Sequence, residues 1–200
     1  MRVWALLISL NTLGVDAMLT KLFLVISLIL PISLFAYSPS DTAATHSYVG
    51  VKTCGMCHRS AKQGDQLGVW QKSMHSKAYE TLKTEKADKI AKEKGFSTPA
   101  VETPECLKCH TSGSNVAAEF KEAKFSIEDG VQCETCHGPG SDYKSLKVMK
   151  DKELAIKNGL EMHDNTEEFC KSCHNPESPT FVEFNFKESW DKIKHPIPSR

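Results

Sequence analysis

The pattern Cys-x-x-Cys-His occurs four times in the sequence and constrains the fold more than any other feature. Its first Cys is residue 54, 106, 133 and 170. The pattern is the attachment signature of c-type haem. Two Cys three residues apart on a helical turn present both sulfurs to one edge of a porphyrin, and the following His lies where it can bind iron. All eight Cys of the chain belong to these motifs: Cys54, Cys57, Cys106, Cys109, Cys133, Cys136, Cys170 and Cys173.

Structural zinc is the alternative, because four Cys pairs could build two tetrahedral thiolate sites. Zinc does not require a His after every pair, and the chain has only eight His in 200 residues. A thiol-rich zinc module also fits poorly with export to an oxidising compartment. We therefore expect four covalent c-type haems, with His58, His110, His137 and His174 as their proximal ligands.

The other four His residues are candidates for the second axial position. Low-spin haem carriers need a second ligand, and His is one of the two usual choices. His75 falls on an amphipathic stretch, His163 precedes the last motif, and His195 follows the last expected helix. We predict that these three bind iron. His46 lies in a polar segment and is the alternative source of a fourth ligand.

The N-terminal segment predicts export. Lys21 precedes an apolar run over residues 22–35, and the small residue Ala36 follows it. A basic start, a short apolar run and a small residue are typical of a secretory signal peptide. An uncleaved membrane anchor is the alternative, but the run is shorter than the roughly 20 residues of a spanning helix, and Pro31 interrupts it. We expect no stable membrane span after cleavage.

This interpretation divides the chain into three parts. Residues 1–36 form the signal peptide, of which 1–17 precede a second Met at Met18 and are interpreted as a mis-assigned extension. Residues 37–48 form a polar leader, and 49–200 the haem-binding domain. Export implies a periplasmic location. The formal net charge is zero, so composition gives no reason to expect nucleic-acid binding.

Between the motifs the apolar spacing predicts helices and little or no strand. Apolar residues three and four apart predict a helix over 67–82, and further helices are expected over 85–94, as a pair over 141–158, and over 186–194. Apolar side chains are otherwise scattered. The expected fold is all-α: a compact helical shell around four haems that supply much of the buried apolar surface.

The sequence resembles the tetrahaem cytochrome c-554 family. The resemblance extends over about 48–195 and is most specific where Cys-His-Gly-Pro-Gly follows a helix that contains Trp and His. Its matching stretches are Gly50 to His58, Trp70 to Tyr79, Cys106 to His110, Gly130 to Gly140, and Phe184 to His195.

The resemblance implies closely packed haem pairs, with His75 opposite His137 and no protein ligand opposite His110. The family's type member has a His shortly after Gly-Pro-Gly, but here none occurs between Gly140 and His163. The first and fourth haems would then take their distal ligands from elsewhere, and His163 and His195 are available.

The resemblance also implies a function. Members of the family are carriers that accept electrons from hydroxylamine oxidoreductase, so we expect a carrier whose partners are other redox proteins. The alternative is a haem enzyme that reduces or oxidises a small nitrogen species or peroxide at an open iron on His110. A haem-based gas sensor is disfavoured, because the chain has no recognisable output domain.

The motif count generates a first prediction. The intact mass of the exported protein should exceed that of the processed polypeptide by four haem masses, because each motif forms two thioether bonds. Mass spectrometry of the purified protein measures this. A mass equal to the polypeptide plus zinc would contradict the haem interpretation.

Overall fold

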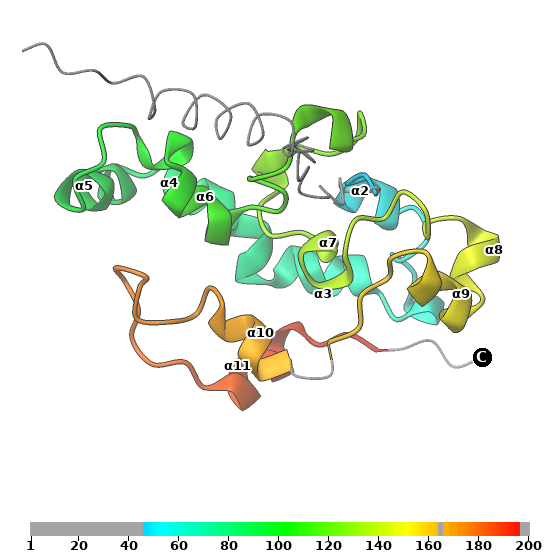
Figure 1. Ribbon diagram of the computed structural model, residues 1–200. Coiled ribbons are helices and arrows are strands. Elements are labelled where there is room, and N and C mark those ends of the chain that lie inside the picture. Colours follow the sequence, from blue (N-terminus) through cyan, green and yellow to red (C-terminus); the bar gives the residue numbers. More distant parts are fainter. Residues whose placement is uncertain (1–45, 164–165, 197–200) are drawn as a thin grey trace, which may run out of the picture. The chain divides into compact units, whose positions relative to one another are not determined.

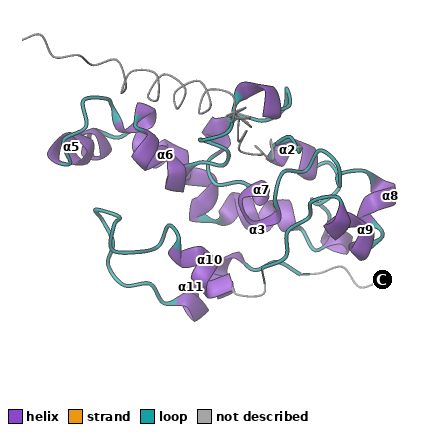
Figure 2. Ribbon diagram, in the orientation of Figure 1, coloured by secondary structure: helices purple, strands orange, loops and turns teal. Residues whose placement is uncertain are grey.

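The computed structural model describes residues 46–163 and 166–196. Within these ranges the chain is helical, and its only pairing of extended segments is an isolated bridge between Tyr48 and Lys121. The all-α expectation is therefore confirmed for the described residues (Figures 1 and 2). The signal peptide and most of the polar leader lie outside them.

The α-helices are α2 (Val51–Cys54), α3 (Gln66–Lys72), α4 (Ala78–Leu82), α5 (Glu85–Glu93), α6 (Pro104–His110), α7 (Cys133–His137), α8 (Leu146–Met149), α9 (Lys152–Lys157), α10 (Thr166–Lys171) and α11 (Phe186–Ile193).

The helix expected over 67–82 is broken in the middle. α3 ends at Lys72, Ser73 is extended with φ −81° and ψ 160°, and a 3-10 turn over Met74–Lys77 leads into α4. The Ser73 hydroxyl donates to the carbonyl of Trp70 at 2.7 Å, which ties the break to the end of α3. Hydroxyl side chains compete in this way with the helical hydrogen bonds. The break places His75 in the 3-10 turn rather than on a continuous helix.

The other expected helices are confirmed, although the pair expected from residue 141 begins only at Leu146. α5 ends just before Gly95, α8 and α9 form the pair expected over 141–158, and α11 ends at Ile193. Their N-cap side chains accept hydrogen bonds from the first turn, as short polar residues at this position do. The capping residues are Thr84, Ser145, Asp151 and Asn185.

A buried carboxylate joins the first and third Cys motifs. Glu134, between the two Cys of the third motif, accepts hydrogen bonds from the backbone N–H groups of Val49, Gly50 and Gly140, each at 2.8 Å. Its neighbour Gln132 accepts from the N–H of Val51 at 2.8 Å. The N–H groups of Val49, Gly50 and Val51 lie at the start of α2 and have no partner within the helix, so these bonds satisfy them. α2 is therefore docked on the entrance to α7.

The described residues contain only a small apolar core. Leu82, Ala91 and Ala100 are buried together, with Phe96 and Leu107 packed against them. Several large apolar side chains are exposed, including Met74, Val182 and Trp190. Such a core is small for a chain of this length, which agrees with the expectation that porphyrins supply apolar surface. None of the described helices has the length and apolar character needed to cross a membrane.

Glu134 generates the second prediction. Glu134→Ala would leave three N–H donors without an acceptor, at about 1–3 kcal/mol for each buried group. We expect the thermal midpoint of the haem-loaded protein to fall by more than roughly 6 °C, measured by circular dichroism. Glu119→Ala is the control, because Glu119 is exposed and should change the midpoint by no more than about 2 °C. Equal midpoints for the two variants would contradict the role of Glu134.

Candidate haem-binding site

Each Cys motif lies on a helical turn. The second and third motifs are contained in α6 and α7, and the first and fourth begin at the ends of α2 and α10. In the first and fourth motifs the His N–H donates to the carbonyl of the first Cys, at 3.1 Å for His58 and 3.0 Å for His174. All four motifs thus have the turn that directs two thiols and an imidazole to one side.

Cysteines of different motifs are neighbours. Cys54 and Cys133 share a thiol hydrogen bond, which raises the pKa of Cys54 far above its usual value and lowers that of Cys133. Burial, together with a hydrogen bond to Cys173, raises the pKa of Cys109 to about 12. The first motif therefore lies beside the third, and the second beside the fourth.

The third and fourth motifs are also close. Burial raises the pKa of Cys136 to about 11, and the nearby thiol of Cys170 adds to the effect. The attachment sites consequently follow one another in space in the order first, third, fourth, second. This order differs from their order in the sequence.

Two pairs of His rings, called facing rings from here on, lie near each other with ring planes tilted by 53° and 48°. The ring centres of His75 and His174 are 6.1 Å apart, and those of His137 and His195 are 5.9 Å apart. A metal–imidazole bond is about 2 Å long, so two imidazoles on one iron have ring centres roughly 6 Å apart. Both pairs therefore fit an iron between them, with a proximal His on one side.

The partner of His75 differs from the expectation that placed it opposite His137. The N–H of Val131 donates to the carbonyl of His75 at 3.0 Å, and the indole N–H of Trp70 donates to the carbonyl of Val131 at 2.7 Å. Gly130 has a φ of +74°, and a Cβ there would lie 2.6 Å from the His75 carbonyl oxygen. The segment before the third motif thus holds the backbone of His75, while its ring faces His174 and His195 faces His137.

The ring environments favour the neutral imidazole that metals require. Burial lowers the pKa of His75, His137 and His174, and a neighbouring imidazole lowers each further. At His110 the Nδ1 atom is 2.8 Å from the carbonyl oxygen of Ala78 and 3.1 Å from the hydroxyl of Thr81. A partner on Nδ1 fixes the tautomer and leaves Nε2 for iron.

The two remaining His residues are not in a facing pair. His163 stacks on Phe169 with ring centres 4.0 Å apart, and its buried Nε2 has no hydrogen-bond partner. Its assignment as an iron ligand stays a prediction. His46 lies with its Nδ1 2.9 Å from a carboxylate oxygen of Asp142. Sequence reasoning had no signal for Asp142. It placed Phe184 in a stretch that matches the family but not in its stacking on His174, where the ring centres are 4.9 Å apart.

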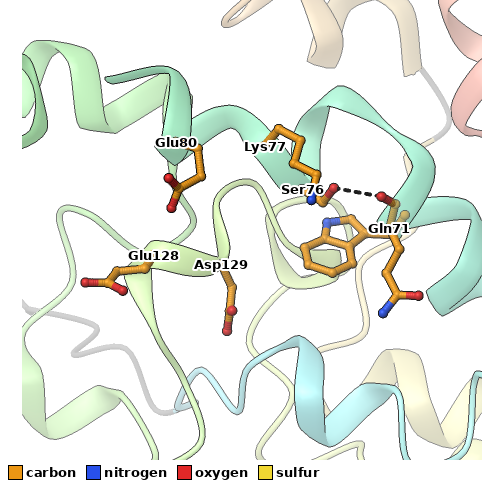
Figure 3. Close-up of a pocket in the computed structure, with 7 residues that line it drawn as sticks. Gln71, Ser76, Lys77, Glu80, Glu128 and Asp129 are labelled. Atoms are coloured by element: carbon orange, nitrogen blue, oxygen red, sulfur yellow. Dashed lines mark hydrogen bonds between the residues drawn. The ribbon is translucent and has the colours of Figure 1, made fainter. Parts of the chain in front are cut away.

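A polar pocket of about 400 Å³ lies beside the residues that follow His75 (Figure 3). Glu80, Glu128 and Asp129 line it, together with Trp70, Gln71, Ser76 and Lys77, and the Ser76 hydroxyl donates to the carbonyl of Gln71 at 3.1 Å. Neither Cys nor His lines this pocket, so it is separate from the iron ligands.

Comparison with known proteins agrees with this site. The model of the family described as "Cytochrome c554 and c-prime" matches residues 53–138, which contain the first three motifs. The chain is therefore a c-type cytochrome with covalently bound haem.

A cytochrome c-554 from Nitrosomonas europaea is 33% identical over 153 residues, which are 68% of this chain and 61% of the relative. The chain belongs to the cytochrome c-554 family, and it spans less than two thirds of that relative's length. No solved structure matches it.

The facing rings generate the third prediction. His75→Ala should convert one low-spin haem to high-spin, because the iron on His174 loses its second imidazole. Electron paramagnetic resonance of the oxidised protein measures this, and added imidazole should restore the low-spin signal. Met74→Ala is the matched control, because Met74 is the adjacent residue and its side chain is exposed. A native spectrum for the His75 variant would show that His75 does not bind iron.

Proposed function

We propose that the mature chain is an exported carrier that transfers electrons between redox proteins through four covalent haems. The observation that carries the proposal is the pair of facing imidazoles, His75 with His174 and His137 with His195, at the spacing of two axial ligands on one iron. Iron with two protein ligands has no open position for a substrate, so it can exchange electrons but cannot bind a reactant. Two imidazoles should also keep the reduction potential low.

The spatial order of the motifs supports transfer through the chain. The first, third, fourth and second attachment sites are successive neighbours, as their interacting thiols indicate. When the haems are bound they accept and release electrons. The protein contributes the spacing between them, the neutral imidazoles and the local polarity. An electron that enters at the first or the second haem then has a continuous path through the other three.

The His110 haem is the one position that keeps an enzymatic alternative. In the described part of the chain, neither His110 nor His58 has a facing ring. Of the other His residues, His163 lies within electrostatic reach of His137, and His46 is bonded to Asp142, beside the third motif. Neither is placed at α6. We therefore propose a five-coordinate iron on His110, where a small molecule such as nitric oxide, hydroxylamine or peroxide could bind.

The fourth prediction separates carrier from enzyme. The oxidised protein should show one high-spin ferric signal among low-spin signals, and the fully reduced protein should bind one carbon monoxide per four haems. A redox titration should take up four electrons reversibly. Hydroxylamine, nitrite and peroxide should each give no sustained turnover.

Two outcomes would change this assignment. Sustained turnover of one of these small molecules would make the His110 haem a catalytic centre. Four low-spin haems would remove the open site and leave electron transfer alone.

A further inference from the structure

His46 is held by a short segment that is bonded on both sides. The N–H of Ser47 donates to the hydroxyl of Ser141 at 2.9 Å, and the N–H of Ser141 donates to the carbonyl of Ser47 at 3.1 Å. Tyr48 then pairs with the 120–122 segment through two backbone hydrogen bonds of 2.8 Å. The backbone around His46 is therefore already ordered, so placing the ring adds little conformational entropy cost.

The ring of His46 has the arrangement of a metal ligand. Its Nδ1 is 2.9 Å from one carboxylate oxygen of Asp142, and the hydroxyl of Ser141 donates to the other oxygen at 2.8 Å. A carboxylate on Nδ1 fixes the tautomer with the free electron pair on Nε2 and strengthens that nitrogen as a metal ligand. His110 has the same arrangement with a backbone carbonyl in place of the carboxylate.

Gly159 leaves room for this ring. A Cβ at residue 159 would lie 3.1 Å from Cδ2 and 3.2 Å from Nε2 of His46, and the φ of Gly159 is +96°. The carbonyl oxygen of Gly159 in turn lies 2.8 Å from the position of a Cβ on Gly138, the residue after His137. The Nε2 edge of His46 thus lies beside the third motif, and Glu134 joins that motif to the first one.

Elimination gives the iron that His46 can reach. The irons on His174 and His137 already have facing rings in His75 and His195. Of the other two proximal ligands, His110 is bonded to α4, whereas His58 belongs to the motif that packs against α7. We propose that His46 is the distal axial ligand of the haem attached at Cys54 and Cys57, opposite His58, and that Asp142 is its positioning residue.

His163 is the competing candidate, and it lies within electrostatic reach of His137, whose facing ring is His195. The Nε2 of His163 points toward a carboxylate oxygen of Glu161 at 3.9 Å. That Nε2 is buried and has no hydrogen-bond partner, so His163 is the alternative ligand. The assignment of the distal ligand opposite His58 to His46 differs from the sequence-based expectation, in which His163 binds iron.

The proposal rests on the proposed function, since it requires haem at the first motif, and the test separates the two. His46→Ala, His163→Ala and native protein are compared in the haem-loaded state by intact mass and electron paramagnetic resonance. All three should carry four haems. His46→Ala should show one more high-spin haem than the native protein, and added imidazole should return this haem to the low-spin state. His163→Ala should show no high-spin haem beyond that of the native protein.

Asp142→Asn gives an independent readout, because the exposed side chain allows substitution without disturbing the fold. This variant should keep the native number of low-spin haems, and the midpoint potential of one haem should rise, because the amide makes His46 a weaker donor to ferric iron. The matched control is Asp191→Asn, an exposed carboxylate bonded to two lysines, which should leave all potentials unchanged.

Three results would overturn the proposal. Four haems with a native spin state in His46→Ala would reject His46 alone and leave the proposed function intact. A new high-spin haem in His163→Ala instead would assign the ligand to His163. A native protein without haem on Cys54 and Cys57 would reject both proposals.

Discussion

One buried carboxylate sets the position of the first haem site relative to the third. Glu134 accepts three backbone N–H donors from two parts of the chain and is 1% exposed. A buried carboxylate is costly unless its oxygens are fully bonded, so this arrangement has little freedom to shift. The burial raises the pKa of Glu134, and the three donors oppose that rise. The spacing of two haem sites thus depends on hydrogen bonds more than on apolar packing.

The residues between the paired cysteines therefore have a structural role of their own. Glu134 and Thr135 fill the two variable positions of the third motif, and Thr135 shares a hydrogen bond of 2.5 Å with Ser112. In the second motif, Leu107 packs against the small apolar core. The attachment motif consequently does two things at once: its Cys and His residues face the cofactor, while its variable residues join the motif to the rest of the chain.

The sequence was sufficient for most helices and insufficient for the pairings. Residue composition and spacing predicted α5, α8, α9 and α11, because these signals are local. The attachment residues stay a prediction from motif spacing. The break at Ser73, where the hydroxyl donates to the carbonyl of Trp70, has no counterpart in the apolar spacing. The choice of His174 over His137 as the neighbour of His75 depends on backbone contacts with Gly130 and Val131. Contacts between residues far apart in the sequence leave no periodic signal, so only the structure could provide them.

The interleaved order of the sites has a consequence for biogenesis. A chain is made from its N-terminus, but the first motif is completed by the third and the second by the fourth. The contact between His46 and Asp142 alone spans 96 residues. Contacts of such sequence separation slow folding, because long loops must close before they form. If haem were attached before the chain is complete, the first porphyrins would lack the neighbouring motifs that cover them, so their edges would stay exposed until Cys170 to His174 had joined the fold.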